Sequence, residues 1–458
     1  MLSGGFIQIL ARFMLKENSN IEYPGIIRLL SFFWLIPLSY YFLMTMHYST
    51  NLPGGEEVEI FVNDVRLMFE QETLRDILSV FFIQHAEHRP ATIKLFSVIS
   101  YHIFGEVNFN FLNFVGNTFL FIPMAVVAAS LARNFSDSLL YLLPSMTLLA
   151  SPVHHSCILW TSCSVSQYGS LFWGGLALFF ACRPGLVAFL LFEFCAFWGY
   201  VTLGNGLIII PLGFACLFFA QPHPLRNFFL FAHFLLSSVF IYLYFSDFQT
   251  YGIYETTFVD ATDSWLRFVG NILLWQFSWV GSWSTFSDSK YVALFFGGAE
   301  VVLMLYLLFK YRLKLLATHG YVVFFMVYIL LSISIASFQR SWLLPYEMVF
   351  QPRYKMYSLF LVSLLLLLVM SLIREAFAKS GKTLLWGKTV LVMTLPIAVF
   401  WSMSTLRFEP MLKSKFDSDM QCIEQWTTRN KVEHCGWTLQ HKRMVKSAEK
   451  AGLINIRP

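Results

Sequence analysis

The sequence predicts an all-α fold that crosses a membrane many times. The chain has 458 residues, of which 57% are hydrophobic and only 13% are charged. Soluble globular proteins are about one quarter charged, so much of this surface must face lipid. The apolar residues also fall in runs of roughly 17–25, the length that spans a bilayer as a helix.

Eleven apolar runs predict about 11 transmembrane helices. Two further segments, residues 92–105 and 266–283, are moderately apolar but contain charges. We expect them to lie along the membrane interface, with Lys94 and Arg267 facing water. The expected spans are 29–47, 109–131, 138–153, 166–182, 185–200, 204–220, 226–245, 290–309, 319–337, 356–373 and 388–404.

Positive charges at alternate ends of these runs predict the topology. Lysine and arginine gather where cytoplasmic loops are expected, whereas junctions 154–165 and 201–203 contain neither. By the positive-inside rule, the N-terminus lies in the cytoplasm, and the C-terminus and the longest inter-span loop, 49–108, lie outside. The basic positions are Arg133, Arg183, Arg226, Lys310, Arg312, Lys314, Arg374, Lys379, Lys382 and Lys388.

The chain is expected to form a transmembrane module over residues 1–404 and a small outer tail over 405–458. No small-residue cleavage site follows the first apolar run, so that run is expected to be retained as a helix. Within the first outer loop, residues 62–82 have the apolar spacing of an amphipathic helix pair. A short helix is expected near residues 441–451 of the tail.

The seven cysteines divide into two groups. Cys422 and Cys435 lie in the outer tail, where an oxidising compartment would allow a disulfide between them. The other five lie in or beside apolar runs and are interpreted as small core residues. They are Cys157, Cys163, Cys182, Cys195 and Cys216.

Glu87 is the first candidate for chemistry in the outer loop. It stands in His85-Ala86-Glu87-His88-Arg89-Pro90, just before an expected helix whose N-terminal dipole would keep a carboxylate ionised. Such a carboxylate can act as a general base towards a hydroxyl group. Arg89 could bind a phosphate, or the cluster could simply cap the turn.

A second group of acids follows Gly54-Gly55, which lets the backbone turn sharply out of the first span. A solvated loop explains most of these acids, but Asp64 lies on the apolar-periodic segment and is kept as an alternative base. The group comprises Glu56, Glu57, Glu59 and Asp64.

Arg353 is the first candidate for binding a phosphate. It lies beside Tyr354 at the start of a Leu-rich span, with Arg340 in the same expected outer loop. A guanidinium matches two phosphate oxygens at once, although an interfacial anchor would look the same in sequence. Asn205, between two glycines, and Gln167 are expected to line a cavity or to join helices by hydrogen bonds.

The sequence lacks the features that are typical of several function classes. The basic residues lie at span ends rather than in one patch, so nucleic acid is not an expected partner. No nucleotide-binding motif is present. His85, Glu87 and His88, and the pair His154-His155, match no zinc-site spacing. No metal site or certain cofactor is therefore predicted, and a divalent cation is left open.

This architecture resembles the GT-C class of integral-membrane glycosyltransferases, over most of residues 1–404. More narrowly, it is similar to bacterial multi-span proteins with a Glu-His-Arg stretch in the first outer loop. The pieces that carry the resemblance are Glu87-His88-Arg89, Gly204-Asn205-Gly206-Leu207 leading to Pro211, and Arg353-Tyr354. The chain departs from many members in lacking a paired-acid motif such as Asp-x-Asp in that loop.

The resemblance implies hexosyl or pentosyl transfer from a polyprenyl-phosphate carrier in the bacterial inner membrane, to a glycan, lipid or protein acceptor of the cell envelope. Glu87 or Asp64 would be the catalytic base. The residues expected to bind the substrate or its phosphate are His88, Arg89, Arg340, Arg353 and Tyr354.

Two other functions stay open. A transporter or flippase of lipid-linked saccharides would use the same cavity without a general base. An O-antigen polymerase or ligase would act on diphosphate-linked glycans through arginines and a histidine, for which Arg340, Arg353 and His88 are available.

Overall fold

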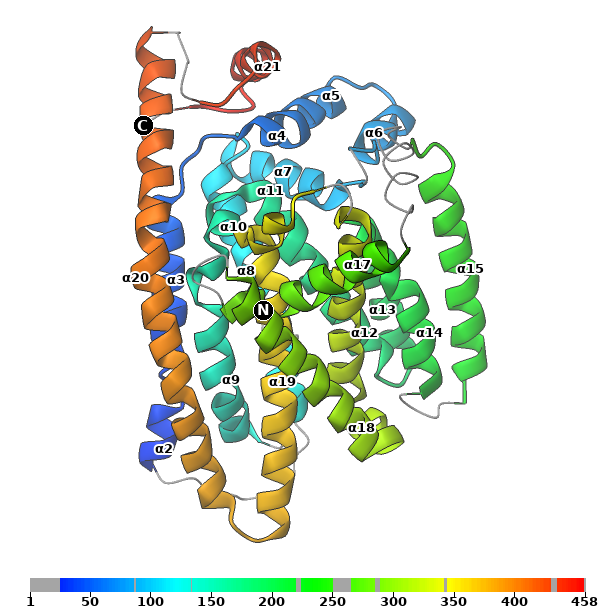
Figure 1. The fold of residues 1–458 in the computed structure, drawn as a ribbon. Coiled ribbons are helices and arrows are strands. Elements are labelled where there is room, and N and C mark those ends of the chain that lie inside the picture. Colours follow the sequence, from blue (N-terminus) through cyan, green and yellow to red (C-terminus); the bar gives the residue numbers. More distant parts are fainter. Residues whose placement is uncertain are drawn as a thin grey trace.

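The computed structural model describes residues 25–85, 88–132, 134–219, 224–249, 265–284, 289–341, 344–429 and 435–456. Every regular element in these ranges is helical. Long helices run side by side along one axis, and short helices gather at one end, drawn at the top of Figure 1. This end contains α4, α5, α6 and α21, and is called the loop end here. The turn between α19 and α20 lies at the opposite end.

Each expected apolar run is helical, although the bounds of several helices differ from the expected ones. Phe109–Leu131 (α8) and Arg226–Phe245 (α15) coincide with the expected residues. The others are α2 Gly25–Leu30, α3 Leu35–Tyr48, α9 Phe135–Leu149, α12 Gly169–Ala181, α13 Leu186–Tyr200, α14 Ile209–Phe219, α17 Trp265–Val280, α18 Lys290–Arg340, α19 Pro352–Lys379 and α20 Thr383–Arg429.

Six helices in the described ranges are long and apolar enough to cross a membrane, which supports a multi-pass membrane protein. Eleven crossings are not shown. At a rise of 1.5 Å per residue, the 15 residues of α13 reach only about 23 Å, less than a bilayer core of ~30 Å. The six begin at Gly25, Phe109, Arg226, Lys290, Pro352 and Leu384.

Two expected spans, 290–309 and 319–337, form the two arms of α18. The backbone leaves helical geometry at Arg312, whose φ is 47°, and at His319, whose φ is −128°. A positive φ is uncommon for a residue with a side chain, so the helix bends here rather than continuing straight. The basic residues between the arms lie at this bend.

The first outer loop contains short helices, as the apolar spacing predicts. A π-helix, Val58–Asn63, follows α4 (Gly55–Glu57), and then come α5 (Asp64–Phe69) and α6 (Leu74–Phe81). After a segment that includes His85 and His88, Ala91–Phe104 forms α7.

The prediction that Lys94 faces water is wrong. Lys94 lies on α7 with no exposed surface. Its ammonium is 2.9 Å from the Asp64 carboxylate and donates to the carbonyl of Val80 at 2.8 Å. A buried cation is tolerated because a buried anion and a carbonyl replace its water. Arg267 is exposed.

The outer tail begins as a continuation of the last long helix. α20 runs without a break through residue 405 and extends along the edge of the molecule to the loop end (Figure 1). The expected tail helix is α21, Leu439–Lys450. It packs on the π-helix of the first loop, where His441 contacts Glu59 at 3.1 Å. Trp437 also donates to the carbonyl of Pro53 at 2.9 Å.

Candidate functional site

Glu57 joins the first outer loop to the segment after α10 (His155–Leu159). Its carboxylate accepts hydrogen bonds from the backbone N–H of Gly54 at 2.6 Å and of Ser162 at 2.9 Å. The side chain is buried, and this burial raises the pKa of Glu57 to about 7, although the two N–H donors oppose the shift. Both oxygens are occupied by the fold, so Glu57 has a structural role.

Glu56 is the acid of this group that remains accessible. It accepts a 3.4 Å hydrogen bond from the hydroxyl of Ser162. Although part of the side chain is exposed, the surrounding protein desolvates the carboxyl and raises its pKa above the ordinary value. The Ser162 hydroxyl and the positive charges of Arg353 and His85 oppose this shift. A carboxylate in this setting can accept a proton from a bound hydroxyl group.

Arg353 lies near Glu56 at the start of α19, where Pro352 occupies the first turn. Its guanidinium is 5.8 Å from the ring of Trp160 and 5.0 Å from that of Tyr354. Its Nε is buried without a hydrogen-bond partner, and no direct ion pair joins Arg353 to Glu56. The guanidinium is therefore held by aromatic rings and keeps hydrogen-bond capacity for an anion.

Arg340 approaches the same tyrosine from the end of α18. Its guanidinium is 4.8 Å from the Tyr354 ring and also contacts the Tyr354 hydroxyl. Trp279 fixes the tyrosine from α17 by packing on its ring at 4.7 Å and donating to its carbonyl at 2.8 Å. Two guanidinium groups thus converge on one tyrosine ring.

A cavity of about 470 Å³ opens beside this cluster. Tyr354 and Arg340 belong to its wall, as do Asn205 and Gln167, the two residues expected to line a cavity. The remaining lining residues are His88, Leu203, Gly204, Leu207, Tyr244, Phe245, Phe248, Gln249, Trp279, Ser332, Ile335, Ala336, Gln339 and Tyr357. This volume falls in the range of small-molecule sites.

Asn205 is held firmly in the cavity wall. Its amide donates to Ser332 at 3.2 Å and to Tyr357 at 3.1 Å, and its oxygen accepts from Ser170 at 3.0 Å. The flanking Gly206 packs against the backbone of Gly199 so closely that an added Cβ would lie 1.9 Å from the Gly199 carbonyl oxygen. This close approach requires a residue without a side chain.

The geometry determines the tautomer of His88. The backbone N–H of Gly204 donates to its Nδ1 at 3.2 Å. An N–H group can only donate, so Nδ1 must be unprotonated, and the proton of the neutral ring is on Nε2.

Arg89, which sequence reasoning offered as a phosphate ligand, is committed to the fold. It is buried and donates to the carbonyls of Phe82 at 2.7 Å and Tyr244 at 3.1 Å. It also pairs with Asp247. These contacts hold the end of α15 against the first loop.

Of the two expected catalytic acids, the described residues include only Asp64. Asp64 is buried, and one of its oxygens is shared by Lys94 and by His85, the latter at 2.7 Å. This carboxylate is engaged by the fold. Glu87 lies outside the described residues.

Two disulfides lie at the loop end. One joins Cys422 of α20 to Cys435, the pair considered from sequence. The other joins Cys157 to Cys163, so the interpretation of these two as core thiols is wrong. The apolar neighbours concealed this pair in the sequence, although a Cys-x5-Cys spacing in an expected outer junction was a usable signal. Cys182, Cys195 and Cys216 are free thiols.

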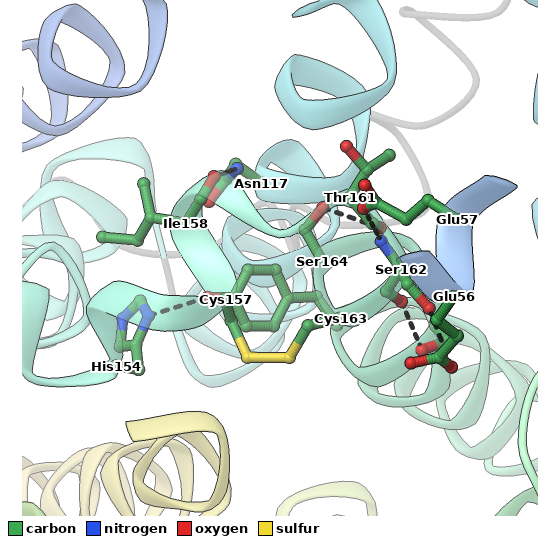
Figure 2. Close-up of a disulfide and its surroundings, with 12 residues drawn as sticks. Glu56, Glu57, Asn117, His154, Cys157, Ile158, Thr161, Ser162, Cys163 and Ser164 are labelled. Atoms are coloured by element: carbon green, nitrogen blue, oxygen red, sulfur yellow. Dashed lines mark hydrogen bonds between the residues drawn. A yellow bond between two sulfur atoms is a disulfide. The ribbon is translucent and has the colours of Figure 1, made fainter. Parts of the chain in front are cut away.

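The Cys157–Cys163 bridge closes the short loop that supports the site. Figure 2 shows the disulfide on one side of this loop and Glu56 and Glu57 on the other. The loop contains Trp160, which supports Arg353, and Ser162, which contacts both acids. Sequence reasoning missed this loop because none of its residues has an ionisable side chain suited to catalysis.

No group of three His, Cys, Asp or Glu side chains that could hold a metal ion occurs within the part of the chain that the structure describes. Comparisons with known proteins give no match: no protein-family model, no curated protein and no solved structure is similar to this chain. Its function therefore has to be argued from the geometry of the site.

Proposed function

We propose that this protein is a membrane glycosyltransferase that moves a sugar from a polyprenyl-phosphate carrier to a hydroxyl group of a glycan, lipid or protein acceptor. The proposal is carried by Arg353 and Arg340, which both contact the ring of Tyr354 in the cavity wall, and by Glu56, on which the positive charge of Arg353 acts. An acid close to a guanidinium can supply the base for an acceptor hydroxyl beside a cation for the departing phosphate.

The proposed step is a direct displacement. Glu56 takes the proton of the acceptor hydroxyl as its oxygen attacks the anomeric carbon. The bond between that carbon and the phosphate oxygen breaks, and the polyprenyl phosphate leaves with the bonding electrons. Arg353 and Arg340 stabilise the leaving phosphate. A single displacement predicts inversion at the anomeric carbon.

Glu56 replaces Asp64 as the proposed base for a physical reason. Asp64 already pairs with Lys94 and His85, and Glu57 accepts two backbone N–H groups. Proton transfer from a substrate would require either acid to abandon these contacts. Glu87 stays a candidate on the sequence argument and belongs in the same test.

Two features support a site that faces away from the cytoplasm. Both disulfides lie at the loop end, and disulfides persist in oxidising compartments. The turn between α19 and α20, with Lys379 and Lys382, lies at the opposite end, as the positive-inside rule requires of a cytoplasmic loop.

The test is a transfer assay in lipid nanodiscs. Synthetic polyprenyl-phosphate glucose with a radiolabelled sugar is the donor, and a cell-envelope extract supplies acceptors. We expect Glu56→Gln to lower kcat by roughly 100-fold or more, the usual contribution of a general base, and Arg353→Ala to raise KM and lower kcat. Glu87→Gln is assayed in parallel.

Glu72→Gln is the matched control, because Glu72 is an exposed acid of the same loop. Thermal unfolding of each variant separates lost chemistry from lost folding. Full activity in both Glu56→Gln and Arg353→Ala would refute the site. Movement of the donor across the bilayer without a new glycosidic bond would refute the transferase and favour a flippase.

A further inference from the structure

The cavity wall contains neutral amides that make no side-chain hydrogen bond to the described part of the chain, among them those of Gln167 and Gln339. Gln167 lies in the π-helix Ser164–Tyr168 and Gln339 in the last turn of α18, and both line the cavity. Neither side chain makes a hydrogen bond to the described part of the chain, in contrast to Asn205, whose amide has three partners. Each free amide offers donors and an acceptor to a ligand.

The cavity has a charged end and a neutral end. Arg340 is the charged group among the described lining residues, and Arg353 lies behind Tyr354 near it. Away from this end, the polar lining groups are the amides, the hydroxyls of Ser332 and Tyr357, and the Nε2–H of His88. Aromatic rings, including that of Trp279, cover other parts of the wall.

We infer that this cavity selects a donor with a neutral, hydroxyl-bearing sugar over one with a cationic amino sugar. The inference rests on the proposed function, because it takes the phosphate to lie at the arginines. Amides pair with vicinal hydroxyls, whereas an ammonium would need a carboxylate and would be repelled by the guanidiniums. Gln167 and Gln339 are then two of the residues that contribute to the choice of sugar, together with Gln249.

The experiment measures binding in nanodiscs without an acceptor, so it does not depend on catalysis. Three lipids are compared: polyprenyl phosphate, polyprenyl-phosphate glucose, and polyprenyl-phosphate 4-amino-4-deoxyarabinose. We expect the glucose lipid to bind at least about tenfold more tightly than the other two, since it offers hydroxyl groups to the amides and carries no ammonium to be repelled by the guanidiniums.

The double variant Gln167→Met/Gln339→Met preserves side-chain size and removes the amides. It is expected to lose this preference, at roughly five- to tenfold per amide, while binding plain polyprenyl phosphate as before. Gln421→Met, at an exposed position of α20, is the matched control. Gln339→Glu is expected to raise the affinity for the amino sugar.

The outcomes separate the two proposals. If none of the three lipids binds, the proposed function fails. If plain polyprenyl phosphate binds but glucose adds no affinity, or if the double variant keeps the preference, only the inference about the sugar is overturned. Tighter binding of the amino sugar by the unmodified protein would overturn it as well.

Discussion

The ammonium of Lys94 lies 2.9 Å from the carboxylate of Asp64, and both side chains are buried. This ion pair joins α7 to the start of α5. His85 contacts the same carboxylate oxygen at 2.7 Å, so the acid also holds the segment that precedes α7. Lys94, which was expected to face water, and Asp64, which was expected as a possible catalytic base, therefore form one buried ion pair that holds these segments together.

Asp64→Asn is predicted to destabilise the protein severely. It leaves the Lys94 ammonium buried without its counter-charge, a change that costs about 3–5 kcal/mol. Thermal unfolding in detergent measures the loss, and Asp64→Asn/Lys94→Met should recover much of it. The exposed pair Arg66–Glu70 is the control, since Glu70→Gln should cost less than about 1 kcal/mol. A stable Asp64→Asn variant that lacks transfer activity would instead make Asp64 the base.

The stability of the protein should depend on pH through Glu57. Burial raises the pKa of this carboxyl from 4.5 to about 7. Between these two pH values, the folded state therefore holds a proton that the unfolded chain has released. The contribution of Glu57 is complete below its unfolded pKa and is lost as the pH rises through about 7. We expect the unfolding temperature to fall over this range and Glu57→Gln to flatten the fall. Equal slopes in Glu57→Gln and in the control Glu72→Gln would contradict this.

The two disulfides predict how many cysteines an alkylating reagent can modify. Denatured, unreduced protein should bind iodoacetamide at three cysteines, and reduced protein at all seven. Cys157→Ser/Cys163→Ser should lower the free energy of unfolding by about 2 kcal/mol, as expected for a short closed loop. It should also impair transfer more than Cys422→Ser/Cys435→Ser, because the first bridge supports Trp160 and Ser162. Labelling at five cysteines before reduction would refute one of the bridges.

The two ends of the bundle should label from opposite sides of the membrane. Cysteines introduced at Glu72 and at Lys382, both exposed, are tested in a variant whose three free thiols are replaced by serine. In intact spheroplasts, an impermeant maleimide should modify position 72, while position 382 reacts only after lysis. The reverse pattern would place the site in the cytosol and exclude the proposed donor geometry.

The helices were the most predictable part of the fold. Residues 109–131 and 226–245 were expected as spans and are α8 and α15. An uninterrupted apolar run in a membrane must satisfy its backbone internally, so sequence alone indicates a helix there. The number of crossings was less predictable. Short helices such as α13 have one buried side and one exposed side, and hydropathy does not separate lipid contact from protein contact.

The site was predictable in part. The sequence singled out four polar residues in or beside apolar runs. Three of them line the cavity, namely Arg340, Asn205 and Gln167, and Arg353 contacts the lining residue Tyr354. Which acid accompanies them was not predictable. The sequence contains several acids in one loop, and only their burial and partners distinguish Glu56 from Asp64.

Composition and the spacing of charges determined that this chain is a helical membrane protein with polar loops, because the cost of placing charge in lipid leaves few alternatives. The tertiary structure decided the partners: Lys94 turned inward to Asp64, Cys157 bound Cys163, and Arg353 was placed near Glu56. Such pairings depend on which helices meet at which depth, and no local pattern of residues encodes that.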